Sequence, residues 1–189
     1  MSGLARSCCG GVEAESDGKA RATVDSIRLR DAEGGDLEAV QALLRQTGLP
    51  IDGLEDQFVG GFAIVEAEGS VVGAAGIERH GRYGLLRSVV VDPRVQGGRV
   101  GERLVTDRLA WAEAEGLECV YLLTTTAEPY FARFGFEVVD RATSPDEIRA
   151  SSEFAVVCPA SARAMKLAAG AGPEGLKAKI RARYGAAAS

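Results

Sequence analysis

The segment "LLRSVVVDPRVQGGRVGERLV", residues 85–105, decides the fold. Its first seven residues, 85–91, are mostly Val and Leu with little alternation, which is typical of a strand buried on both faces of a sheet. A glycine pair, Gly97 and Gly98, separates this strand from residues 101–115, whose apolar side chains recur at helical spacing. The segment therefore predicts a central strand, a glycine turn and an amphipathic helix.

The glycine turn has two interpretations. A strand that passes through glycines into a helix presents unpaired N–H groups and the positive end of the helix dipole, which together can bind an anion. A glycine pair is nevertheless more often only a tight turn. No Lys-Ser/Thr pair follows, as in nucleoside-triphosphate loops, and the next strand ends in three threonines, residues 124–126, instead of the acidic residue of a dinucleotide fold.

The chain on both sides of this segment predicts further strands and helices around one sheet. Residues 35–48 have helical spacing with Asp36 as the expected N-cap, and the strands 62–68 and 71–78 form a hairpin through Gly69 and Ser70. The remaining predicted elements are strands at 26–32, 118–124 and 135–140, short helices at 54–61 and 129–134, and apolar segments at 153–158 and 162–168. This order predicts the mixed α/β class.

Composition limits the partners. The 189 residues are 46% hydrophobic and carry a net charge of −5, which fits one globular domain with tails and argues against nucleic acid. No apolar run approaches the roughly 20 residues that cross a membrane, so a soluble cytoplasmic protein is expected. The four cysteines resemble neither a disulfide framework nor a metal site. Cys119 and Cys158 are expected in the core, and Cys8 and Cys9 in a disordered tail.

Four strings, two of which overlap, carry a family resemblance. "VVVDPRVQGGRVG", residues 89–101, resembles the acyl-CoA loop of the GNAT superfamily of N-acetyltransferases, with Gln96 and Gly101 at the first and last positions of its motif. "AEPYFARFGF" is similar to that superfamily's short aromatic helix and its Gly-Phe pair. The longer strings "YLLTTTAEPYFARFGF" and "SSEFAVVCPASARAM" resemble the arsenic-resistance-associated N-acetyltransferases, a subgroup similar to the acetyltransferase domain of N-acetylglutamate synthases.

The resemblance implies an activity and a domain plan. It implies a GNAT fold over residues 25–168, with a disordered tail at 1–24 and a flexible basic tail at 169–189. The implied reaction transfers acetyl from acetyl-CoA, without a metal, to the amine of a small amino acid or an analogue such as an organoarsenical or phosphinothricin. The alternatives are N-acetylation of glutamate and a non-catalytic module that senses CoA or a metalloid. A homodimer is left open, and no nucleic-acid or membrane partner is expected.

The resemblance also implies the residues that bind acetyl-CoA. They are Val89, Val90, Val91, Gln96, Gly97, Gly98, Arg99, Val100, Gly101 and Phe131. Two of them depart from the superfamily pattern. Arg99 replaces the middle glycine of the loop, and we expect a negative φ there because it stands at a helix start. Phe131 occupies the position of a general-acid tyrosine, and the neighbouring Tyr130 is expected to point about 100° away, so no tyrosine acid is expected.

The expected acceptor residues are Glu78, Arg87, Ser88, Thr124 and Thr125. Arg87 lies in an apolar strand and needs an anionic partner, which is either an acceptor anion or an internal carboxylate such as Glu78. Glu78 is either the base that deprotonates the acceptor or an exposed hairpin residue. The threonine hydroxyls either bind a polar substrate or are ordinary strand residues. His80 is expected in a solvated turn.

Overall fold

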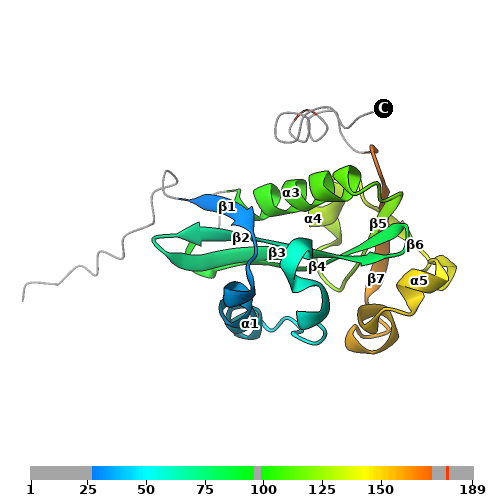
Figure 1. Cartoon of the computed structure of the whole chain (residues 1–189). Helices are drawn as coiled ribbons and strands as arrows, with labels where there is room; N and C mark the ends of the chain where they lie inside the picture. The colour runs from blue at the N-terminus through cyan, green and yellow to red at the C-terminus, as the bar shows by residue number, and fades with distance from the viewer. Residues whose placement is uncertain (1–26, 96–98, 172–177, 179–189) are drawn as a thin grey trace, which may run out of the picture.

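The computed structural model describes residues 27–95, 99–171 and 178. These residues form one seven-stranded sheet in the order β1-β2-β3-β4-β5-β7-β6, flanked by helices (Figure 1). The strands are β1 (Arg28–Asp31), β2 (Phe62–Ala67), β3 (Ser70–His80), β4 (Tyr83–Val91), β5 (Cys119–Thr124), β6 (Glu137–Val139) and β7 (Arg163–Ala168). Only β4 and β5 pair in parallel, and the other neighbours are antiparallel. The predicted mixed α/β architecture is therefore confirmed.

The helices cover both faces of the sheet. In Figure 1, α1 lies below the sheet, and α3 lies above it with α4 beside it. The α-helices are α1 (Leu37–Gln46), α2 (Phe58–Gly61), α3 (Val100–Ala114), α4 (Glu128–Ala132) and α5 (Asp146–Arg149), and η6 (Glu153–Val157) is a π-helix. Short 3-10 helices are η2 (Gly34–Asp36), η3 (Glu55–Gln57), η4 (Pro93–Val95) and η5 (Arg141–Thr143). The predicted helix at 101–115 is α3, and the predicted aromatic helix is α4. The glycine pair before α3 lies outside the described residues.

The β2–β3 turn is shifted by one residue from the predicted one, and the β3–β4 hairpin is tighter than the sequence predicted. The β2–β3 turn consists of Glu68 and Gly69, whose φ angles of 52° and 74° suit a two-residue hairpin turn, and Ser70 already pairs with Ala67. Strand β3 continues to His80, which pairs with Tyr83. The expectation that His80 lies in a solvated turn is therefore wrong, because strand pairing extends through it.

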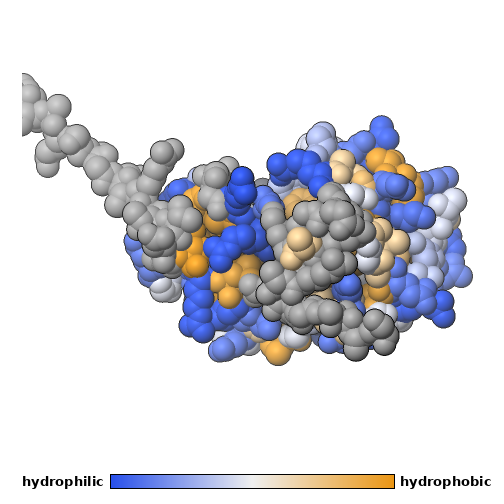
Figure 2. Space-filling view, turned by 90° about the horizontal axis from the view of Figure 1, so that it is seen from above, coloured by the Kyte–Doolittle hydropathy of each residue, from blue (hydrophilic) through white to orange (hydrophobic). Residues whose placement is uncertain are grey.

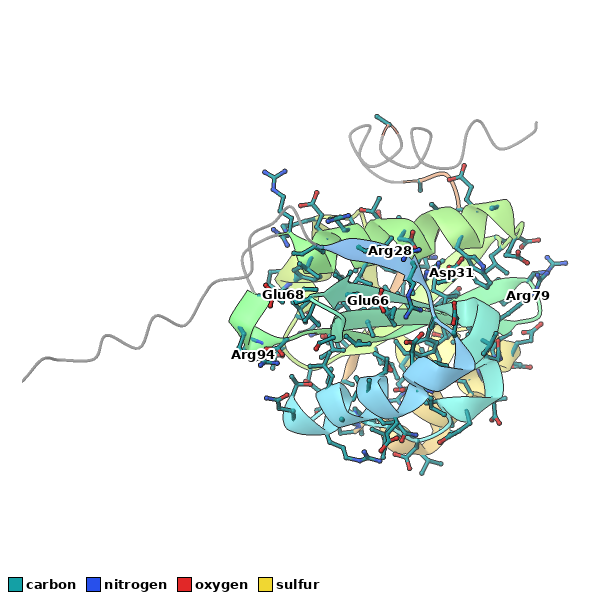
Figure 3. The ribbon with its side chains drawn as sticks, turned by 60° about the vertical axis from the view of Figure 1, so that its left-hand side comes forward. Arg28, Asp31, Glu66, Glu68, Arg79 and Arg94 are labelled. Atoms are coloured by element: carbon teal, nitrogen blue, oxygen red, sulfur yellow. The ribbon has the colours of Figure 1, made fainter. Side chains whose placement is uncertain are left out.

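The free edge of the sheet at β1 is protected by charge. Figure 3 turns this edge forward and shows Arg28 and Asp31 of β1 beside Glu66 of β2. Arg30 forms ion pairs of 2.7 Å with both Asp36 and Glu66. Asp36 stands at the N-cap of α1, as expected, but its side chain bonds Arg30 and the backbone N–H of Glu33. Charged side chains of this kind discourage a further strand from pairing with an exposed edge.

The apolar residues form layers on both faces of the sheet. Leu104 and Val105 of α3 are fully buried on one side, and Val40 and Leu44 of α1 are fully buried on the other. Seen from above, the apolar patches on the visible surface are separated by hydrophilic residues (Figure 2). Within the described part of the chain, no helix has the length and apolar character needed to cross a membrane. The buried layers hold β4 in the middle of the sheet.

Strand β4 parts from β5 halfway along its length. The parallel pairing begins at Tyr83 and ends at Leu85, which pairs with Tyr121. On its other side β4 stays paired with β3 as far as Val91, with a register irregularity between Ala74 and Gly76. Ser88 in this part of β4 has a φ of 56°, which marks a β-bulge that bends the strand. The central position of β4 is as predicted, and the divergence from β5 was not foreseen.

Candidate active site

A cleft of about 880 Å³ opens where β4 and β5 diverge. Its walls come from the loop after α1, the second half of β4, the start of α3, the end of β5, α4 and the segment from η6 to β7. Ten of the expected site residues line it: Arg87, Ser88, Val89, Val91, Arg99, Val100, Gly101, Thr124, Thr125 and Phe131. Glu78 and Val90 are not among the lining residues, and Gln96, Gly97 and Gly98 lie outside the described residues.

One side of the cleft is formed by main chain. Because the pairing with β5 ends at Leu85, the β4 backbone at Ser88 and Val89 faces the cleft instead of a neighbouring strand. Helix α3 begins at Val100, next to this strand, so its N-terminus also lies at the cleft. Backbone N–H groups require hydrogen-bond partners, and the first N–H groups of a helix have none within the helix. This side can therefore bind an extended polar ligand with an anionic end.

Gly101 allows α4 to lie against the start of α3. A Cβ atom on Gly101 would lie 2.8 Å from the hydroxyl oxygen of Tyr130. That hydroxyl is buried and has no hydrogen-bond partner among the described residues. Burial, together with the nearby charge of Glu102, raises the pKa of Tyr130, so its hydroxyl stays protonated and can donate. An orphaned donor beside a helix N-terminus is a suitable contact for an anionic or carbonyl ligand.

The expectation that Tyr130 points away from the site is wrong. Both residues line the cleft, although they are neighbours on α4. Phe131 is 8% exposed and belongs to the core, whereas Tyr130 packs its ring against Phe131 and Phe134. Adjacent residues of a helix are about 100° apart, and a helix that crosses the end of a cleft can present both of them. Only the placement of α4 against α3 reveals this.

Arg99 has the opposite backbone conformation from the one expected. Its φ is 57° and its ψ is 20°, which is left-handed. The expectation of a negative φ is wrong because Arg99 is the N-cap of α3, and a cap residue is not bound to helical dihedrals. A side chain with a Cβ atom is strained in this region, where glycine is favoured. The substitution of glycine by arginine thus introduces strain at the edge of the cleft.

Arg87 has internal carboxylate partners. Its Nη1 forms an ion pair with Glu78, and its Nη2 lies 2.7 Å from an oxygen of Glu153 and donates to the carbonyl oxygen of Asp52 at 2.7 Å. Of the two partners left open by the sequence, the internal salt bridge is present. It involves a second carboxylate, Glu153, which the sequence analysis did not select. The only sequence signal for Glu153 is an acidic residue that opens the apolar segment 153–158.

Glu78 is neither exposed nor on the wall of the cleft. It is 6% exposed, and besides Arg87 it lies 3.4 Å from Nε2 of His80. Burial raises the pKa of the Glu78 carboxyl, but the hydrogen bond from His80 and the charge of Arg87 outweigh it, so the pKa lies below its usual value. A buried carboxylate that stays ionised against Arg87 acts mainly to hold that guanidinium in place.

The remaining polar groups of the cleft come from β5 and the segment after η6. The Thr124 hydroxyl accepts a hydrogen bond of 3.0 Å from the N–H of Ala127, at the start of α4, while Thr125 is exposed. Cys158 is partly exposed and lines the cleft, so its expected place in the core is wrong. Its thiol donates to Glu153 at 2.9 Å, and burial and this carboxylate raise the thiol pKa to about 12.

A metal centre is not evident in the part of the chain that the structure describes. Within it, no three His, Cys, Asp or Glu side chains are grouped so that they could hold an ion. Cys8 and Cys9 lie outside the described residues. The polar groups that line the cleft include main-chain amides, hydroxyls, Arg87 with Glu153, the Cys158 thiol and the charged residues Arg99, Glu102 and Arg133.

Two curated relatives share moderate similarity with this chain. One is an amino-acid acetyltransferase of Neisseria meningitidis, 26% identical over 132 residues, which are 65% of this chain and 30% of the relative. The other is the uncharacterized protein YwlB of Bacillus subtilis, 28% identical over 131 residues, which are 67% of this chain and 86% of YwlB. The chain thus spans less than a third of the length of the Neisseria relative.

Solved structures share the fold. The N-acetylglutamate synthase of Neisseria gonorrhoeae, complexed with coenzyme A and N-acetyl-glutamate, has a TM-score of 0.64 at 23% identity, over 76% of this chain and 35% of the synthase. Rv2747 of Mycobacterium tuberculosis, in complex with CoA, has a TM-score of 0.64 at 23% identity, over 75% of this chain and 98% of Rv2747. The model of the acetyltransferase (GNAT) family matches residues 23–136, and the chain belongs to that family.

Proposed function

We propose that this protein transfers an acetyl group from acetyl-CoA to the amine of a small amino acid or amino-acid analogue. The observation that carries the proposal is the cleft between β4 and β5. It has main-chain donors on one side and, on the other, a buried ionic cluster made of Arg87, Glu78 and Glu153. The coenzyme A in the complexes of the Neisseria gonorrhoeae and Mycobacterium tuberculosis proteins supports it.

The main-chain side of the cleft fits acetyl-CoA. The β4 backbone at Val89 can pair with the amides of the pantetheine arm, and the N-terminus of α3 at Val100 and Gly101 can bind the pyrophosphate. Loop residues Gln96 to Gly98 are proposed to complete this binding. When bound, acetyl-CoA supplies the acetyl group: the neutral amine bonds to the thioester carbon, the carbon–sulfur bond breaks, and a proton from nitrogen ends on the thiol.

The residues of this chain contribute position and polarity more than covalent chemistry. A main-chain N–H of the β4 bulge, which lines the cleft, can donate to the thioester oxygen as negative charge develops on it. The buried Tyr130 hydroxyl can donate in the same cleft. Holding both substrates in contact lowers the barrier because their relative motion is already lost on binding. No nucleophilic side chain is required.

The acceptor is proposed at the level of its class. The Neisseria relatives are amino-acid acetyltransferases, and one solved neighbour carries N-acetyl-glutamate, which favours an acceptor with an amino-acid amine. Glutamate itself is one candidate. The arsenic-resistance subgroup and its organoarsenical or phosphinothricin acceptors remain predictions from the sequence resemblance, as does a homodimer.

Acetyl-CoA binding and thiol release test the proposal. A ligand at a hundred times its dissociation constant should stabilise the protein by about 2.7 kcal/mol in thermal melts. Gly101→Ala should weaken acetyl-CoA binding about tenfold, because its Cβ meets the Tyr130 hydroxyl at the cofactor side. Gly34→Ala is the matched control, since no atom lies within 4 Å of the added Cβ. Absence of acetyl-CoA binding, or of thiol release with any amino acid, would refute the proposed activity.

A further inference from the structure

Glu153 is the carboxylate of the ionic cluster that reaches the cleft. It belongs to the π-helix η6, a backbone form that occurs frequently at functional sites. One carboxylate oxygen lies 2.7 Å from Nη2 of Arg87, and the other accepts from the Cys158 thiol at 2.9 Å. Glu153, Arg87 and Cys158 all line the cleft, whereas Glu78, the other partner of Arg87, does not.

The ion pairs of this cluster leave an excess of negative charge. Among the described residues, Arg87 is the guanidinium that forms ion pairs with Glu78 and Glu153, and both glutamate residues are less than 9% exposed. Arg141 donates to the carbonyl oxygens of Phe154, Cys158 and Pro159, and it forms no ion pair with either carboxylate. His80 contacts the oxygen of Glu78 that does not pair with Arg87. A buried charge without full compensation is unfavourable, and a cation entering the cleft would relieve it.

The same contacts argue against an acceptor anion at Arg87. Its two terminal nitrogens already bond two carboxylates and the Asp52 carbonyl, so an anion placed there would meet both carboxylates at short range. Like charges at that separation repel strongly in a partly buried site. Arg87 and Glu153 both line the cleft. The group of a ligand that contacts this pair should therefore be a cation.

We propose that Glu153 binds the ammonium group of the acceptor, which releases one proton to water before the neutral amine attacks, and that Arg87 is a positioning residue that orients Glu153 instead of binding an acceptor anion. The inference rests on the proposed acetyl transfer and specifies its acceptor side. It places the amine at the wall formed by η6, across the cleft from the main-chain side assigned to acetyl-CoA. An alkylamine without a carboxylate should therefore still bind, and a carboxylic acid without an amine should not.

Steady-state kinetics on four variants test this placement. The acceptor is the amine that the wild type acetylates best among the twenty standard amino acids and n-propylamine. Glu153→Gln should raise the acceptor KM about 10- to 100-fold and leave the acetyl-CoA KM within about twofold, because only a charge-assisted contact to the amine is lost. Glu153→Asp keeps the charge and should restore part of the loss. Glu78→Gln removes the other carboxylate partner of Arg87 but is off the cleft wall.

The outcomes separate the inference from the proposed function. Glu78→Gln should lower the melting temperature as Glu153→Gln does, with a smaller rise in acceptor KM, and Glu147→Gln on exposed α5 controls for a change of net charge. Equal rises in acceptor KM for the two buried variants, or a wild-type KM in Glu153→Gln, would overturn the inference alone. If Glu153→Gln does not fold, the wild type decides: inhibition of the acceptor reaction by a carboxylic acid without an amine, together with no inhibition by n-propylamine, overturns it. A wild type that acetylates no amine overturns both.

Discussion

Two buried arginines differ in what surrounds them. Arg108 of α3 is fully buried, and every nitrogen of its guanidinium bonds to Asp107, Asp31 or the Gly61 carbonyl. Arg87 of β4 is 5% exposed, yet its Nε has no partner among the described residues, and it lines the cleft. Arg108 is satisfied within the fold, whereas Arg87 is held by two carboxylates, of which Glu153 lines the cleft.

This difference teaches how to distinguish a structural cation from a functional one. Both arginines stand in apolar elements, and burial alone does not separate them. The separation comes from where the counter-ions lie. The partners of Arg108 join α3 to β1 and to the end of α2, which ties the sheet to its helices. One partner of Arg87 lies on the cleft wall. Four predictions test the comparison, in order of expected effect.

Arg108→Met should be the most damaging change. It removes an ion-pair partner of Asp107, which is 1% exposed, and a broken buried ion pair costs about 3–5 kcal/mol of unfolding free energy. Urea unfolding measures this, and the acetyl-CoA affinity of the folded fraction should stay at the wild-type value. A loss of stability below about 1 kcal/mol, or a selective loss of affinity, would contradict a purely structural role.

Arg87→Met should cost less stability, about 2–3 kcal/mol, because water in the cleft can solvate Glu153 once its partner is gone. The sharper measurement is a double-mutant cycle in urea with Glu153→Gln. Removing the second charge should recover part of the loss, giving a coupling of about 0.5–3 kcal/mol for residues in direct contact. Additive losses would show that the two side chains act independently.

Arg99→Gly should stabilise the protein by about 0.5–1 kcal/mol. The left-handed conformation at φ 57° costs a residue with a Cβ atom roughly 1–2 kcal/mol, which glycine avoids. The greater conformational entropy of glycine in the unfolded chain offsets part of this stabilisation. Arg103→Gly is the matched control: this residue is exposed within α3, where glycine should cost about 1 kcal/mol. Thermal unfolding of the two variants should shift in opposite directions, and shifts of the same sign would refute the strain.

The smallest effect is the reactivity of Cys158. Because its thiol pKa is raised to about 12, the reactive thiolate is scarce at pH 8, and each unit of pKa reduces the thiolate about tenfold. Alkylation by iodoacetamide, followed by peptide mass spectrometry, should be slower at Cys158 than in the unfolded chain. Glu153→Gln should accelerate it, since the carboxylate is one cause of the raised pKa. An unchanged alkylation rate in that variant would show that the Glu153 carboxylate does not affect the Cys158 thiol.

Local patterns predicted the elements of this fold well. The apolar run 85–91 became β4, and the spacing of Leu104, Val105 and Leu109 became the buried face of α3. These predictions hold because the periodicity of a strand or a helix can be read from residues that are close together in the sequence. They fail by a residue or two at hairpins, where pairing across strands sets the turn.

The candidate site was predicted less completely than the fold. Main-chain and loop positions from Val89 to Gly101 follow from a string of adjacent residues, and all of those described except Val90 and the segment from Asp92 to Val95 line the cleft. Glu153 was missed because it lies 66 positions from Arg87 in the numbering, and no local pattern marks such a pair. The left-handed φ of Arg99 was missed because capping geometry depends on how the helix packs.

By itself, the sequence determined the order of the main strands and helices, including β4 followed by α3, and the family of the chain, since each depends on residues close together along it. The tertiary structure alone decided where β4 leaves β5, which carboxylates hold Arg87 and which of them faces the cleft. The physical reason is that ion pairs and cleft walls form between residues brought together by packing, and the energies that select them act through space.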